Sequence, residues 1–219
     1  MKVISNTAIS LDGRINTIEG TFTLLGSAVD HQKMQHIRRL ADAVLVGGQT
    51  FRNWPYPSIS DRPDDQGAIW NVVVSRSGDI PLLPEFVNEP RTRKLLLLER
   101  QPRPPSVPAE IEVEVYQGPL PHAPISWMME CLAERGVKNL LVEAGGELLS
   151  QFVAADALDE LYVTLCPVLI GGKTTPGLVG GLGFSLLQMP RLTLLSSEVV
   201  GDEIFLHYRV NREAKTAKS

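Results

Sequence analysis

Apolar residues gather in two kinds of segment along the chain: short continuous runs, and longer stretches where they recur every three or four positions. Runs such as Ala43–Val46 and Leu140–Val142 are typical of strands that are buried on both faces. Between residues 29 and 41, the apolar positions have the spacing of one helix face. Because strands and helices alternate, the pattern predicts an α/β protein with a mostly parallel sheet.

The pattern ends in an antiparallel hairpin, whose turn Gly201-Asp202 is a strong two-residue signal. No segment before residue 210 has the composition of an interdomain linker. We therefore expect one domain at 1–210, followed by a polar tail at 211–219. The predicted strands are 2–9, 43–46, 70–74, 94–98, 111–116, 137–143, 159–165, 192–200 and 203–210.

Two predicted strands are each followed closely by a pair of glycines and a helical pattern. Gly145-Gly146 follows the strand that ends at Glu143, and Gly47-Gly48 follows the second strand. Glycine lets a backbone approach a ligand closely, and the free amides at a helix start suit a phosphate. The pairing indicates two walls of a nucleotide cleft, with Glu143 at a strand end where open α/β sheets bind ligands. The alternative is two tight turns and a surface acid.

Several other polar positions are candidates for binding or capping. Asp12 lies in an Asp-Gly turn, as a substrate contact or a simple turn former. Ser75 and Arg76 end the third strand, where they suit the ribose 2′-phosphate that distinguishes NADPH from NADH, or form a solvated loop. Ser27 and Asp30 fit a capping box, in which Asp30 reaches back to the Ser27 amide.

Composition restricts the partners and the setting. The net charge is −4 with both signs interspersed, so we expect no nucleic-acid or membrane surface, and a small molecule as the partner. No apolar run approaches the roughly 20 residues of a membrane helix, and the N-terminus turns polar too soon for a signal peptide. Cys131 and Cys166 have no framework spacing, so we expect buried thiols in a cytoplasmic protein and no metal site.

Five sequence blocks extend over nearly the whole chain: 5–14, 43–50, 142–146, 159–161 and 167–172. Together, and in this order, they resemble the reductase domain of riboflavin biosynthesis, a branch of the dihydrofolate reductase fold. The resemblance implies a three-layer fold, with helices on both faces of a mostly parallel sheet. It also implies an NADPH-dependent reduction of a pyrimidine ribosylamine 5′-phosphate, the diaminopyrimidine or the deaminated uracil, to its ribitylamino form. In such a reaction, the enzyme would act mainly by holding the cofactor and the substrate in a reactive geometry, more than through a strong acid–base pair.

The resemblance also implies roles for residues at matching positions. Asn6, Arg38 and Glu143 would contact the substrate, and Asp12 would lie at the same end of the cleft. Asp12 and Glu143 are the candidate catalytic carboxylates, and Arg76 would hold the 2′-phosphate. The other residues expected to contact NADPH are Ala8, Leu24, Thr50, Ser75, Gly145, Gly146, Glu147 and Leu148.

Two departures from the family pattern keep alternatives open. The zinc ligands of the deaminase domain of the bifunctional enzymes are absent. Residues 51–57 differ from the family in a region that contacts substrate, so a reductase of another pteridine- or pyrimidine-like compound, such as dihydrofolate, is an alternative. Dihydrofolate reductases hold the pterin with a carboxylate on the first long helix, and the expected capping role of Asp30 counts against that alternative.

A third possibility is a protein that binds NADPH without catalysis. Whatever the chemistry, the consecutive apolar residues 204–206 predict a hairpin buried on both faces. We therefore expect a homodimer.

Overall fold

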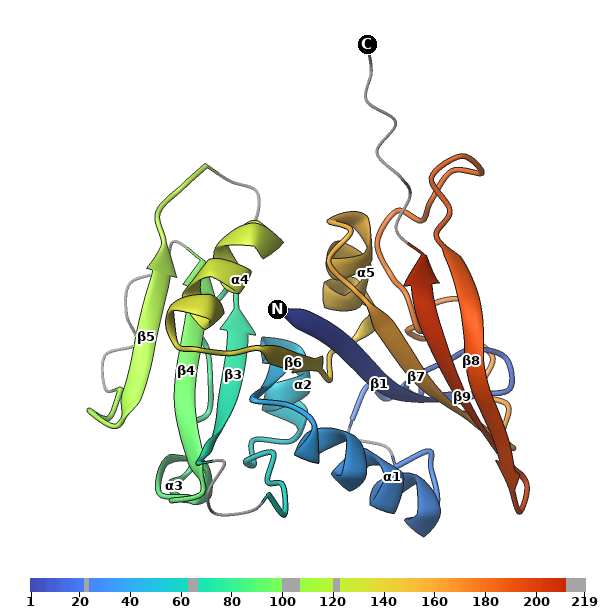
Figure 1. Ribbon diagram of the computed structural model, residues 1–219, viewed down its shortest axis with the longest axis horizontal. Helices are drawn as coiled ribbons and strands as arrows, with labels where there is room; N and C mark the ends of the chain where they lie inside the picture. The colour runs from blue at the N-terminus through green and yellow to red at the C-terminus, as the bar shows by residue number, and fades with distance from the viewer. Residues whose placement is uncertain (22–23, 63–66, 100–106, 120–122, 212–219) are drawn as a thin grey trace.

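The computed structural model describes residues 1–21, 24–62, 67–99, 107–119 and 123–211. In these ranges the strands form one nine-stranded sheet in the order β5-β4-β3-β2-β6-β1-β7-β9-β8 (Figure 1). Strands β1 to β7 pair in parallel, and β9 runs antiparallel to both β7 and β8. The strands are β1 (Lys2–Ser10), β2 (Ala43–Gly47), β3 (Ile69–Ser75), β4 (Thr92–Glu99), β5 (Ile111–Tyr116), β6 (Asn139–Val142), β7 (Glu160–Cys166), β8 (Arg191–Val200) and β9 (Glu203–Asn211).

Helices cover both faces of this sheet because side chains alternate along each strand. In β4, Leu95 and Leu97 pack in the cluster that α4 and α5 complete, whereas Leu96 and Leu98 pack with α2 and α3. Ile37 of α1 packs on the α2 side of the central strands. This arrangement confirms the predicted three-layer fold. The helices are α1 (Ala28–Arg39), α2 (Gly48–Asn53), α3 (Pro84–Val87), α4 (Ile125–Glu134) and α5 (Gly146–Ala154).

The start of α1 differs from the predicted capping box. Ser27 Oγ accepts from Val29 N at 3.1 Å, as an N-cap does. The Ser27 amide, however, donates to Glu203 Oε1 at 2.7 Å, and Ser27 Oγ donates to Glu203 Oε2 at 2.6 Å. The reciprocal carboxylate therefore comes from the first residue of β9, and the capping role predicted for Asp30 is wrong.

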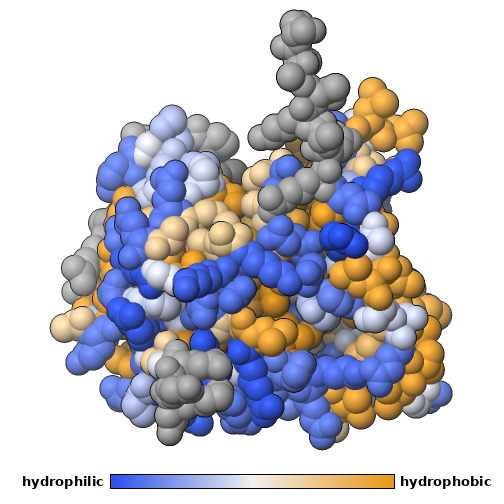
Figure 2. Space-filling view, viewed as in Figure 1, coloured by the Kyte–Doolittle hydropathy of each residue, from blue (hydrophilic) through white to orange (hydrophobic). Residues whose placement is uncertain are grey.

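Strands β8 and β9 form the predicted antiparallel hairpin. The predicted burial of this hairpin on both faces is not observed. β9 lies between β7 and β8, so β8 forms the edge of the sheet. Phe205 is buried, whereas Ile204 and Leu206 are half-buried, so the two-sided burial predicted for 204–206 holds only for its central residue. Apolar side chains gather at the right of Figure 2, where Figure 1 places the hairpin. The exposed ones on β8 include Leu192, Leu194, Leu195 and Val199.

Three further expectations concern the rest of the chain. Cys131 and Cys166 are free and buried, and burial raises the pKa of each thiol to about 11, as expected for inert thiols. None of the helices that the structure describes is long and apolar enough to cross a membrane. Of the predicted polar tail 211–219, residues 212–219 lie outside the described ranges.

Candidate active site

A cavity of about 240 Å³ lies where the carboxyl halves of the central parallel strands meet α1 and α2. Asn6 and Ala8 enter it from β1, and Glu143 directly follows β6. Open α/β sheets bind ligands at this edge, so the cavity is the candidate active site. Its polar lining includes Asn6, Asp30, Arg38, Thr50, Asn71 and Glu143.

An ion pair between α1 and the end of β6 dominates the charge of the cavity. Arg38 Nε donates to Glu143 Oε1 at 2.8 Å and Arg38 Nη2 to Glu143 Oε2 at 2.6 Å, with each side chain 14% exposed. Burial alone lowers the pKa of Arg38, but the charge and hydrogen bonds of Glu143 outweigh it, so the pKa is raised. The two-pronged contact fixes both groups in one relative orientation.

The segment that departs from the family pattern forms one wall of the cavity. Asn71, a buried residue of β3, accepts from Ser58 N at 2.6 Å and donates to Ser58 O at 3.0 Å. This clamp ties the segment to the sheet. It presents Trp54 and Tyr56, whose ring centroids lie 4.8 Å apart and whose side chains remain about half exposed. A planar ring in the cavity would therefore meet an aromatic surface.

The two glycine turns face each other across the same region. A Cβ built on Gly47 would lie 3.8 Å from Cδ2 of Leu148, and one built on Gly145 would lie 4.0 Å from Oγ1 of Thr50. Gly145 is the N-cap of α5 and makes no side-chain cap, so its first-turn amides are not satisfied by a capping side chain. The two turns therefore lie side by side at the carboxyl ends of β2 and β6.

The second glycine of each pair is explained by protein packing instead of ligand approach. A Cβ on Gly146 would lie 2.4 Å from the Gly177 carbonyl oxygen, and Gly180 N donates to Gly146 O at 2.9 Å. A Cβ on Gly48 would lie 3.1 Å from Oγ of Ser75. Both residues therefore allow neighbouring segments to pack closely, which gives a reason for these two glycines that involves no ligand.

Ser75 and Arg76 lie beside α2 at the end of β3, outside the lining of the cavity. Ser75 is buried, and its Oγ accepts from Gly78 N at 3.1 Å, so this hydroxyl stabilises the turn. Arg76 is exposed. Arg52 of α2 donates to the Asp79 carbonyl at 3.0 Å and so brings a second guanidinium to the same turn. The sequence analysis missed Arg52, although its place in α2 follows from the short helix after Gly48.

Asp12 is outside the lining of the cavity and anchors a loop. Its Oδ1 accepts from Ile170 N at 3.0 Å and its Oδ2 from Gly171 N at 2.7 Å, and Ser10 Oγ also donates to it at 2.7 Å. These hydrogen bonds, with Ile170 the largest contributor, lower the pKa of Asp12 to about 2. Such a carboxylate is a weak base at neutral pH. The placement supports a structural role, and its expected position at the substrate end of the cleft is not observed.

Asp30 lies in the cavity, which the sequence analysis missed. Burial raises the pKa of Asp30; a hydrogen bond from Thr164 opposes this, and the nearby charge of Glu203 adds to it. No local signal distinguishes Asp30 from a cap, because Glu203 lies far along the chain. Asn71 could have been recognised, since a polar residue inside an apolar strand needs a partner when buried.

The structure brings together most, but not all, of the residues predicted for the site. Those that line the cavity are Asn6, Ala8, Leu24, Arg38, Thr50 and Glu143. Those that lie around the two glycine turns, outside the lining, are Ser75, Arg76, Gly145, Gly146, Glu147 and Leu148.

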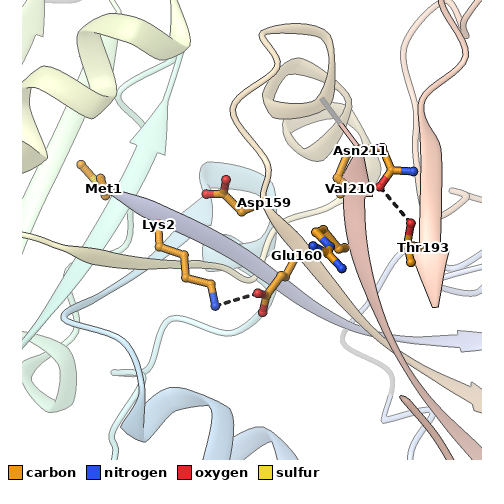
Figure 3. Close-up of a pocket in the computed structure, with 8 residues that line it drawn as sticks. Met1, Lys2, Asp159, Glu160, Thr193, Val210 and Asn211 are labelled. Atoms are coloured by element: carbon orange, nitrogen blue, oxygen red, sulfur yellow. Dashed lines mark hydrogen bonds and ion pairs between the residues drawn. The ribbon is translucent and has the colours of Figure 1, made fainter. Parts of the chain in front are cut away.

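A second hollow, larger and more open at about 820 Å³, lies at the amino ends of β1 and β7, at the other edge of the sheet from the cavity (Figure 3). Lys2 and Glu160, at the amino ends of β1 and β7, form an ion pair there at 2.7 Å, and Thr193 hydrogen-bonds to Asn211 at 3.0 Å. These four polar residues therefore pair with one another. The hollow is also at the amino ends of the strands, where open α/β sheets do not bind ligands. The smaller cavity remains the candidate site.

Solved structures with the same fold define the class of protein. A dihydrofolate reductase from Enterococcus faecalis matches 96% of this chain and 97% of its own, with a TM-score of 0.51 and 13% identity. The RibD protein of Acinetobacter baumannii matches 96% of this chain and 58% of its own, with a TM-score of 0.78 and 21% identity. The fold is therefore that of the dihydrofolate reductase-like proteins.

The family follows from the sequence. The model of the RibD C-terminal domain matches residues 1–206, so the chain belongs to that family. The riboflavin biosynthesis protein RibD of Synechocystis is 28% identical over 92% of the chain, which spans 55% of that protein. The 2,5-diamino-6-ribosylamino-4(3H)-pyrimidinone 5′-phosphate reductase of Methanothermobacter thermautotrophicus is 26% identical over 95% of the chain and 97% of its own length.

Proposed function

We propose that this protein is an NADPH-dependent reductase of riboflavin biosynthesis, which converts a pyrimidine ribosylamino 5′-phosphate to its ribitylamino form. The observation that carries the proposal is a single cavity, at the ligand-binding edge of a RibD-type sheet, that joins Asn6, Ala8, Arg38, Thr50 and Glu143. Relatives with the name of this reductase match almost end to end, which supports the chain acting as one reductase domain.

The residues on either side of the glycine turns fit a dinucleotide. Gly47 and Gly145 leave their backbone open to an incoming group, and Thr50, which lines the cavity, lies near Gly145. The first-turn amides of α5 suit a phosphate. Arg76 and Arg52 place two cations at the turn after β3, where they suit a ribose 2′-phosphate. NADPH bound here would supply hydride to the first carbon of the opened sugar.

The remaining residues of the cavity position the substrate. The bidentate contact with Glu143 holds the Arg38 guanidinium in one orientation, so its Nη1 donors can fix a substrate oxygen without first losing rotamer freedom. The aromatic wall of Trp54 and Tyr56 offers a stacking surface for the pyrimidine ring. Catalysis would then come mainly from holding the reacting carbon close to the nicotinamide.

A second candidate is a reductase of another pteridine- or pyrimidine-like compound, including dihydrofolate. Asp30 is on the first long helix and lines the cavity, so the capping role that counted against this candidate does not apply. The atypical segment 51–57 also forms part of the cavity wall.

One assay separates these candidates. NADPH oxidation is followed by absorbance with the diaminopyrimidine ribosylamino 5′-phosphate in one cuvette and dihydrofolate in another. We expect turnover of the first substrate alone. Turnover of dihydrofolate would establish the second candidate, and tight NADPH binding with no turnover of either would favour a protein that binds the cofactor without catalysis.

Two features of the setting also belong to the proposal. The open β8 edge, with Leu192, Leu194 and Val199 exposed, supports a homodimer formed through the hairpin. A monomeric mass by light scattering at micromolar concentration would refute that assembly. The buried, unpaired thiols Cys131 and Cys166 are consistent with a cytoplasmic protein.

A further inference from the structure

The segment 54–62 forms one wall of the cavity, and it belongs to no helix or strand. Its amino end is joined to α2, because the Trp54 amide donates to the Thr50 carbonyl at 3.1 Å. Its other end is held by the ion pair of Arg62 with Asp42, in which Nη2 lies 3.4 Å from Oδ1. The position of the residues between these two anchors therefore depends on side-chain contacts.

Between the anchors, the side chain of Asn71 takes the place of a strand partner. Asn71 Oδ1 accepts from the Ser58 amide at 2.6 Å, and Nδ2 donates to the Ser58 carbonyl at 3.0 Å. One side-chain amide thus satisfies the backbone donor and the backbone acceptor of the same residue, as a neighbouring strand does. Asn71 is 4% exposed, and β3 pairs with a strand on each side, so the clamp is built on a rigid part of the sheet.

The clamp is close along the chain to the two aromatic rings of the wall. Tyr56 and Trp54 precede Ser58 by two and four residues. Their ring centroids lie 4.8 Å apart, and the side chains are 41% and 49% exposed, so the rest of the protein covers only about half of each. Because packing holds these rings so weakly, their position depends on the hydrogen bonds of Ser58.

We propose that Asn71 is a positioning residue for substrate binding, which acts on the pyrimidine ring through the aromatic wall of Trp54 and Tyr56. This role rests on the proposed function, in which the two rings stack on the pyrimidine. A wall that is already in place requires no ordering when the ligand binds. Without the clamp, the apparent affinity falls with the fraction of time that the wall spends in its binding position.

A direct contact between Asn71 and the ligand is the alternative, since Asn71 itself lines the cavity. The two routes predict different results when the aromatic wall is removed. If Asn71 acts through the wall, Asn71→Ala has no further effect in a chain that carries Trp54→Ala and Tyr56→Ala. If Asn71 contacts the ligand, its effect is the same in both chains.

The binding test uses calorimetry with two probes, NADPH and the 5′-phosphate of 6-ribitylaminouracil, a stable analogue of the ribitylamino product. In Asn71→Ala we expect the pyrimidine to bind about 10- to 100-fold more weakly, as the loss of one stacked base allows. NADPH affinity should change less than about threefold, because its expected contacts at the glycine turns are not held by the clamp. Asn71→Leu, which keeps a similar volume in the sheet, should weaken the pyrimidine in the same way.

A second readout follows the wall without any ligand. The acrylamide quenching of Trp54 is obtained as the difference between each protein and its Trp54→Phe counterpart, because the chain has three tryptophans. Trp54 is 49% exposed, so release of the wall should raise its quenching constant by up to about twofold. The control is Leu96→Ala, a buried position of the neighbouring strand β4 outside the cavity lining. It should lower stability but leave quenching and both affinities unchanged.

Unchanged pyrimidine affinity or unchanged quenching in folded Asn71→Ala and Asn71→Leu would overturn the proposal. An equal effect of Asn71→Ala in the chain without the aromatic wall would also overturn it. These results are separable from a failure of the proposed function. If NADPH is oxidised with the pyrimidine substrate but the Asn71 variants bind normally, the function stands and the role of Asn71 is wrong. If the wild-type protein binds no pyrimidine, the proposed function and the substrate role of Asn71 both fail, whatever the quenching shows.

Discussion

Removing one member of the Arg38–Glu143 pair should destabilise the protein far more than removing both. The charges are about 4 Å apart, which corresponds to roughly 4 kcal/mol of attraction at an effective dielectric constant of about 20. Both side chains are 14% exposed, so the partner left behind would stay largely buried and uncompensated. We therefore expect Glu143→Leu or Arg38→Met alone to cost about 3–5 kcal/mol. For a chain of this size that is a fall in Tm of about 6–20 °C.

The double variant Arg38→Met/Glu143→Leu should lose much less, because apolar side chains of similar volume replace the pair without leaving a buried charge. Urea unfolding of the four proteins in a double-mutant cycle measures the coupling free energy, expected at about 3 kcal/mol or more. Lys33–Glu198 is a matched control, with a contact of 2.6 Å but side chains 33% and 60% exposed. Its coupling should stay below about 1 kcal/mol. Additive effects of Arg38→Met and Glu143→Leu would refute this account of the site.

Three further predictions address the other parts of the site. Arg76→Ala should weaken NADPH binding far more than NADH binding; an equal loss for both cofactors, measured by fluorescence titration, would remove the 2′-phosphate role. Gly146→Ala should cost about 1–3 kcal/mol, because its Cβ would meet backbone atoms 2.4 Å and 2.9 Å away. Gly145→Ala, whose Cβ would have 4.0 Å of room, should change the urea midpoint little but reduce NADPH affinity; similar midpoints for both variants would contradict the packing argument. Asp12→Asn should lower Tm at neutral pH. Because the folded pKa of Asp12 is about 2 against an ordinary 3.8, its stabilisation is complete above about pH 4 and disappears as pH falls toward 2. A Tm difference that does not narrow over that interval would show that the carboxylate is not what stabilises the loop.

The strands and the two glycine turns could be predicted because their signals are local. Apolar runs such as Ala43–Val46 specify strands buried on both faces. Gly47 directly follows one such run, and Gly145 follows another after two residues. The order of elements then places the carboxyl ends of the central strands at one edge, which is why Glu143 was found.

Local sequence could not predict the contacts that join residues far apart in the chain. Ser27 and Asp30 have the spacing of a capping box, yet Glu203 takes that position from the other end of the chain. The loop 177–180 packs against Gly146, and the amides of Ile170 and Gly171 donate hydrogen bonds to Asp12. The local sequence shows which contacts each of these residues can make. The order of the strands in the sheet determines which distant residue lies next to it.

The most direct test of the proposed chemistry follows the hydride itself. The protein is incubated with NADPH carrying deuterium at both C4 positions of the nicotinamide and with the diaminopyrimidine ribosylamino 5′-phosphate, and the product is examined by NMR and mass spectrometry. The account predicts a ribitylamino product with one deuterium, at the first carbon of the sugar chain. A reduced product without deuterium at that carbon, or no reduction while NADPH and the pyrimidine are both bound, would contradict it.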